Sequence, residues 1–116
     1  SMLKDKRNSF GILAPIRGLP DKADELRKRL LALVRLTQYE DGCLSCEMIE
    51  NECDSTEFSL LEKWSNKKAH ESHLRVDRIQ NAMKAVHDLL SRELDIRKHL
   101  FMANLVRYGT NSYCTQ

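Results

Sequence analysis

The sequence has no long hydrophobic run and no excess of charge of one sign. Its longest uninterrupted apolar run is far shorter than the roughly eighteen residues of a membrane-spanning helix, which argues against a membrane protein. The formal charge is only +2, because 19 basic and 17 acidic residues are interleaved along the chain. A nucleic-acid-binding domain normally needs a clustered basic surface, so this pattern also argues against a nucleic-acid partner.

The sequence lacks a second CxxC pair: among the four cysteines, only Cys43 and Cys46 have this spacing. A zinc site built from such pairs needs a second one, and Cys53 and Cys114 are solitary in the sequence. In a strand, residues i and i+3 point to opposite faces, so the two thiols cannot chelate or bond without a bulge. We therefore expect ordinary strand residues, with Cys43 a small buried hydrophobe, and no metal site.

The N-terminal segment SMLKDKRNSF lacks the apolar core and cleavage site of a secretory signal. We expect a cytoplasmic protein with reduced thiols. A chain of 116 residues can bury one modest core, so we expect a single domain over residues 9–102. Residues 1–8 are expected to be a disordered segment in which Ser1 is a tag remnant, and residues 103–116 a C-terminal tail.

Alternating apolar residues predict four strands. The first is FGILAPI at 10–16, in which Pro15 belongs at an edge or near the strand's end because it cannot donate to a ladder. Residues 43–50 and 57–64 alternate in the same way on either side of a polar turn, which predicts an antiparallel hairpin. The segment ELDIRKHLFM at 93–102 is the fourth candidate strand.

Three segments have the apolar spacing of helices. The first begins after Asp21, an expected N-cap, and its apolar stripe is Ala23, Leu26, Leu30, Leu33, Val34 and Thr37. A short helix over 66–74, capped by Ser65 or Asn66, places His70, His73 and Leu74 on one side. Asp77 is the expected cap of the last helix, whose stripe is Ile79, Ala82, Met83, Val86 and Leu90.

The resulting order β-α-β-β-α-β, with the second helix broken in two, predicts the α+β ferredoxin-like fold with its split β-α-β arrangement. Such a domain has a four-stranded antiparallel sheet with helices on one face. The second and third strands carry large apolar residues on both faces, so the face without helices needs a cover. We expect a homodimer through the sheet face.

Short motifs accompany this order of elements. The first helix closes on DGC at 41–43, a strand follows, and then come EKWS at 62–65, Ala69, and His73 in the next helix. In these motifs and their spacing, the chain from about residue 10 to 96 resembles the antibiotic biosynthesis monooxygenase family. The resemblance implies a ferredoxin-like subunit that dimerises sheet to sheet into an α/β barrel, with a pocket between sheet and helices.

The resemblance leaves several activities open, because relatives include cofactor-independent oxygenases of quinols and polyketide-like aromatics, haem-degrading enzymes and a signal-molecule isomerase. The haem-degrading pattern has an asparagine on the first strand, a tryptophan in the short helix and a histidine in the next helix. This sequence departs at all three, with His73 at the tryptophan position, Met83 at the histidine position and no asparagine near Ala14. We do not expect haem degradation.

His73 is the candidate catalytic residue, because an imidazole can take a proton from a phenol or an enol near neutral pH. Trp64 is expected in the core and as a wall for a planar ligand, and Glu62 as an orienting partner of the base. His70 lies i, i+3 from His73, and this pair would hold a metal only with an added carboxylate. The candidate substrate-binding residues are Trp64, Glu62, His70 and Met83.

We therefore expect a cofactor-independent monooxygenase that uses O₂ and a small aromatic or quinol-type substrate. Deprotonation makes a carbanion-like phenolate that reduces O₂ directly, so the protein supplies a base, a dry pocket and orientation. Two alternatives stay open. One is a non-catalytic dimer that binds a small molecule or a protein partner, and the other is an isomerase of a small carbonyl compound that uses the same histidine.

Overall fold

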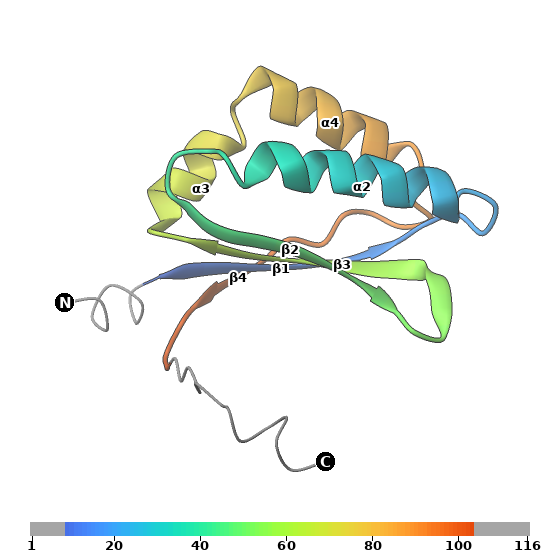
Figure 1. Ribbon diagram of the computed structural model, residues 1–116, viewed down its shortest axis with the longest axis horizontal. Helices are drawn as coiled ribbons and strands as arrows, with labels where there is room; N and C mark the ends of the chain where they lie inside the picture. The colour runs from blue at the N-terminus through green and yellow to red at the C-terminus, as the bar shows by residue number, and fades with distance from the viewer. Residues whose placement is uncertain (1–8, 104–116) are drawn as a thin grey trace, which may run out of the picture.

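The computed structural model describes residues 9–103 (Figure 1). The expected N-terminal segment and all but the first residue of the expected tail lie outside this range. Along the described chain the elements are β1 (Phe10–Arg17), α2 (Ala23–Thr37), β2 (Cys43–Asn51), β3 (Asp54–Trp64), α3 (Lys67–His73), α4 (Asp77–His87) and β4 (Arg97–Leu100).

The described residues form a four-stranded sheet in the order β2-β3-β1-β4, with every neighbouring pair antiparallel. Helices α2, α3 and α4 lie on one face of this sheet (Figure 1). The other face carries no helix from residues 9–103. The predicted α+β ferredoxin-like fold is therefore confirmed, including the break between α3 and α4.

The core lies between the sheet and the helices. Alternate residues of β1 are buried as predicted, and they meet Leu26 and Leu30 of α2, both of which are fully buried. Residues 97–100 are exposed, and β4 is shorter than the predicted segment because Leu94 and Ile96 pack against the core instead of pairing. Since β4 pairs β1 only from Phe10 to Leu13, Pro15 lies where β1 has a neighbour on one side, as expected.

Two predicted helix caps are wrong. The N-cap of α2 is Lys22 rather than Asp21, because a backbone turn joining the Lys22 N–H to the Leu19 carbonyl leads into the helix. The N-cap of α4 is Val76, and Asp77 is the first helical residue. Asp24 and Glu25 in the first turn of α2, and Asp77 in the first turn of α4, still interact favourably with the positive end of the helix dipole.

A bulge in β2 overturns the prediction that Cys43 and Cys46 point to opposite faces. Cys43 pairs with Trp64 and Cys46 with Glu62, and the ladder shifts register between Cys43 and the second residue after it. The extra residue puts both half-buried thiols on the helix-covered face. Burial, helped by the negative charge of Glu62, raises the pKa of Cys43 to about 11 and that of Cys46 to about 12.

The turn before β2 fits closely against α3. Gly42 has a φ of 83°, a conformation that favours glycine, and its carbonyl accepts a hydrogen bond of 2.8 Å from the Ser65 N–H. A Cβ on Gly42 would lie 2.5 Å from the Cβ of Ala69. The small residues in the DGC motif and at position 69 thus allow the turn and α3 to touch.

We predict that Gly42→Ala lowers the free energy of unfolding by about 1–3 kcal/mol, because it adds both backbone strain and a steric clash with α3. Chemical denaturation of the variant and the parent measures the loss. The control is a double-mutant cycle with Ala69→Gly. In the double variant the clash between positions 42 and 69 is gone but the backbone strain at position 42 remains, so the double variant should recover part of the lost stability. An unchanged denaturation midpoint in Gly42→Ala would contradict this reading.

Candidate functional site

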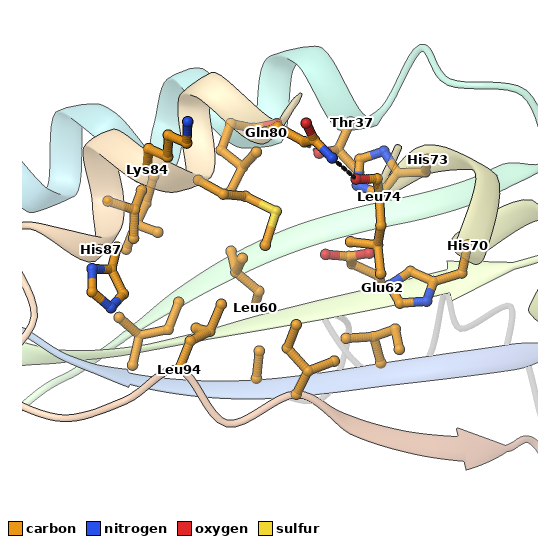
Figure 2. Close-up of a pocket in the computed structure, with 18 of the residues that line it drawn as sticks. Thr37, Leu60, Glu62, His70, His73, Leu74, Gln80, Lys84, His87 and Leu94 are labelled. Carbon is orange, nitrogen blue, oxygen red and sulfur yellow. Dashed lines mark hydrogen bonds between the residues drawn. The ribbon is translucent and has the colours of Figure 1, made fainter. Parts of the chain in front are cut away.

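A pocket of about 570 Å³ lies between the sheet and the helices (Figure 2). Its volume is within the range of small-molecule sites. Most of its wall is apolar, with side chains from β1, α2, β3, α4 and the segments that follow α3 and α4. These apolar residues are Ile12, Ala14, Ile16, Leu30, Leu33, Leu60, Leu74, Met83, Val86, Leu90, Leu94 and Ile96.

The polar groups gather mainly at the end of the pocket next to α3. Glu62 reaches it from β3, and His70 and His73 reach it from α3, while His87 lies at the opposite end (Figure 2). The two α3 histidines share a side because of their i, i+3 spacing, as predicted. Asn66 starts the helix, since its side-chain oxygen accepts the Ala69 N–H at 2.9 Å.

Trp64 packs against the two histidines at this polar end. Its indole is fully buried, with ring centroids 4.7 Å from His73 and 5.6 Å from His70. The indole N–H donates a 2.8 Å hydrogen bond to the Glu62 carboxylate. Trp64 is not among the residues lining this pocket, and in this structure it contacts the imidazoles of α3 that do line it.

Burial sets the protonation state of these groups. It lowers the pKa of His70 to about 4, and the positive charges of His73 and Lys98 act in the same direction. Burial also lowers the pKa of His73, against the opposing charge of Glu40. Both imidazoles are therefore neutral at pH 7 and have a lone pair that can accept a proton.

The pKa of Glu62 shifts in the opposite direction to those of the histidines. Burial raises the pKa of its carboxyl group, and the hydrogen bond from Trp64 partly offsets this effect. The site therefore combines neutral imidazoles with a carboxyl group that is easier to protonate than one in water. Met83, the remaining predicted contact, lines the pocket from α4.

Glu40 belongs to this site and was missed from the sequence. Its side chain is only 11% exposed, one oxygen is 2.9 Å from Arg78 Nη2, and the other is 4.0 Å from His73 Nδ1. The only sequence signal was its position directly before the DGC motif. A glutamate at a helix end is usually solvated, so only the packing of α3 and α4 against this loop reveals it.

No group of three or more His, Cys, Asp and Glu side chains between residues 9 and 103 is arranged to hold a metal ion. Among the helices of the same residues, none is both long and apolar enough to cross a membrane.

An α+β ferredoxin-like domain with a largely apolar pocket and buried histidines is the class that this fold and site define. The sequence profile of the family described as antibiotic biosynthesis monooxygenase matches residues 9–85. This chain belongs to that family. No curated protein matches the chain.

Solved structures agree with the fold. Rv0793 from Mycobacterium tuberculosis is 27% identical, with a TM-score of 0.72 over 87% of this chain and 99% of that one. PA3566 from Pseudomonas aeruginosa is 26% identical, with a TM-score of 0.76 over 84% and 98%. A candidate antibiotic biosynthesis monooxygenase from Deinococcus radiodurans is 24% identical, with a TM-score of 0.77 over 86% and 99%, and at this identity it supports the fold alone.

We predict that His70 makes the protein less stable in mild acid. Its folded pKa of about 4 lies below the ordinary value of 6.5, so the unfolded chain takes up a proton first as pH falls from 6.5 to 4. His70→Gln should remove up to about 3 kcal/mol of the resulting loss of unfolding free energy. Denaturant titrations across this range measure it, with the exposed His87→Gln as control. Parallel pH profiles for parent and His70→Gln would refute the prediction.

Proposed function

We propose that the protein is a cofactor-independent monooxygenase of a small aromatic, quinol-type substrate, with His73 as the base. The observation that carries this proposal is a neutral, buried imidazole on an apolar pocket of about 570 Å³. Membership of the antibiotic biosynthesis monooxygenase family supports the reaction class. The apolar walls favour a planar, weakly polar substrate over a charged one.

The proposed reaction balances without an added reductant. His73 takes a hydroxyl proton from the quinol, and the electron-rich ring carbon of the anion reduces O₂ and bonds to it as a peroxide. The ring proton passes to the outer peroxide oxygen as the O–O bond breaks, which leaves the inner oxygen on the ring as a carbonyl. The other oxygen leaves as hydroxide and receives the proton back from His73, so the products are a hydroxyquinone and water.

The pocket can assist this chemistry in two ways. Its apolar residues exclude water from the anion, which strengthens the interactions that orient it. Glu62, with its raised pKa, can hydrogen-bond a second oxygen of the substrate as either donor or acceptor. The predicted binding roles of His70 and Met83 fit the same arrangement, since both line the pocket.

The presence of His73 and Glu62 at the same end of the pocket also favours a second candidate, an isomerase of a small carbonyl compound. His73 would remove a proton next to the carbonyl group, and protonated Glu62 would return one to the neighbouring position. This transfer needs no O₂. Analysis of the product therefore distinguishes the two reactions.

We also propose that two chains pair through the face of the sheet that lacks a helix. This face has a hollow of about 410 Å³ beside Leu13, Leu61 and Phe101. Ile49 is 52% exposed and, by its register opposite Ser59, points to the same side. A second copy would cover this apolar surface, which a monomer would leave in water.

We predict that the purified protein consumes O₂ with one or more of a panel of quinols and anthrone-like phenols. His73→Ala should slow this reaction by about 10²–10⁴-fold, the usual contribution of a positioned acid or base. An oxygen electrode measures the rate above the autoxidation seen without protein. The control is Ser72→Ala, an exposed neighbour on α3. Unchanged uptake in His73→Ala would remove this residue as the base.

We predict a particle of twice the 13.5 kDa chain mass in sedimentation equilibrium. Leu61→Glu should raise the dissociation constant at least tenfold, because it places a charge in the proposed interface. Leu31→Glu is the matched control, since Leu31 is 40% exposed on α2, on the opposite side of the sheet. A monomeric parent protein would contradict the proposed pairing.

A further inference from the structure

Two buried polar atoms at the edge of the pocket face one another without a bond. His73 Nδ1 and Glu40 Oε1 are both shielded from solvent, and neither has a hydrogen-bond partner among residues 9–103. They are 4.0 Å apart, about 1 Å more than an N–H···O hydrogen bond. A small rotation of the Glu40 side chain would satisfy both atoms together.

The backbone of Glu40 is held in place on both sides. Its N–H donates to the Thr37 carbonyl at 3.0 Å, which continues the end of α2. Its carbonyl accepts the Cys43 N–H at 3.0 Å, which starts β2. The Gly42 turn between these bonds is anchored to Ser65 at the end of β3. The loop thus holds the Glu40 backbone at a fixed place beside α3.

Arg78 fixes the other half of the carboxylate. Its Nη2 atom lies 2.9 Å from Glu40 Oε2, and this bond links the first turn of α4 to the loop. The oxygen left free is the one that faces His73. Because Nδ1 of His73 is enclosed, the imidazole can present only its Nε2 edge to the pocket.

We propose that Glu40 is a positioning residue for His73, accepting a hydrogen bond from Nδ1–H so that Nε2 carries the lone pair that faces the pocket. This proposal rests on the proposed function only for its catalytic consequence. The arrangement places the proton on Nδ1, orients the ring, and stabilises the imidazolium that forms when Nε2 accepts a proton. Arg78 would keep Glu40 in position and would not touch the substrate.

The surroundings of His73 determine what its titration reports. The titratable and charged groups around it are Glu40 from the loop, His70 from α3, Glu62 from β3, Arg78 from α4, and Cys43 from β2, whose thiol is close enough to interact with both carboxylates. Glu40 is the group that raises the pKa of His73 against the effect of burial. Its removal should therefore lower that pKa further.

The test uses ¹⁵N-histidine NMR on the full chain, which reports the protonated ring nitrogen of His73 without requiring a substrate. In the parent protein we expect the proton on Nδ1. In Glu40→Gln we expect a shift toward the Nε2–H form, an apparent pKa lower than in the parent, and a roughly tenfold fall in any O₂ uptake. Arg78→Gln should move the tautomer in the same direction by a smaller amount, because it releases the Glu40 carboxylate that Arg78 holds.

Asp41→Asn is the matched control, because it removes a negative charge from the same loop at an exposed side chain. If the tautomer and titration of His73 are the same in parent, Glu40→Gln and Asp41→Asn, the proposed positioning role is overturned, whatever the activity. If Glu40→Gln alone changes them, the role stands. If Glu40→Gln changes the tautomer of His73 but the parent protein consumes no O₂, the Glu40 contact is supported and the oxygenase is not.

Discussion

The burial of Trp64 is the constraint on which the candidate site depends. The indole occupies the end of β3 with no exposed surface, and α3 must pack its two histidines against it. The indole N–H needs an acceptor once it leaves water, and Glu62, two residues earlier on the same face of the strand, provides it. One aromatic side chain thereby places His70, His73 and Glu62 at the same end of the pocket.

The chemistry of the site is a consequence of the same burial. An imidazole or a carboxylate taken out of water favours its neutral form, so the histidine pKa values fall and that of Glu62 rises. Such an arrangement costs stability, because each neutral group is held in a place that its charged form avoids. Apolar surface elsewhere in the core, including the fully buried Leu26 and Leu30, offsets this cost.

Periodicity predicted most of the fold because the two faces of the sheet differ. The alternation of apolar residues in β1 and the apolar stripe of α2 each indicate which side of the element is buried, and both agree with the structure. The bulge in β2 could not be predicted, since nothing in CLSCEMIE marks the extra residue that brings Cys43 and Cys46 to one face. The helix caps failed for a similar reason: backbone bonds in the preceding turn replaced the expected Asp21 side chain.

By itself, the sequence determined the order of elements, the helix-covered sheet, and the presence of His70 and His73 on one side of a short helix, because these follow from local spacing. Only the tertiary structure decided that Trp64 supports the histidines instead of lining the pocket, and that Glu40 lies beside His73. Glu40 and His73 come from different elements, and their proximity depends on how α3 packs on the Gly42 turn. Contacts of this kind depend on shape across the whole core, which local periodicity does not encode.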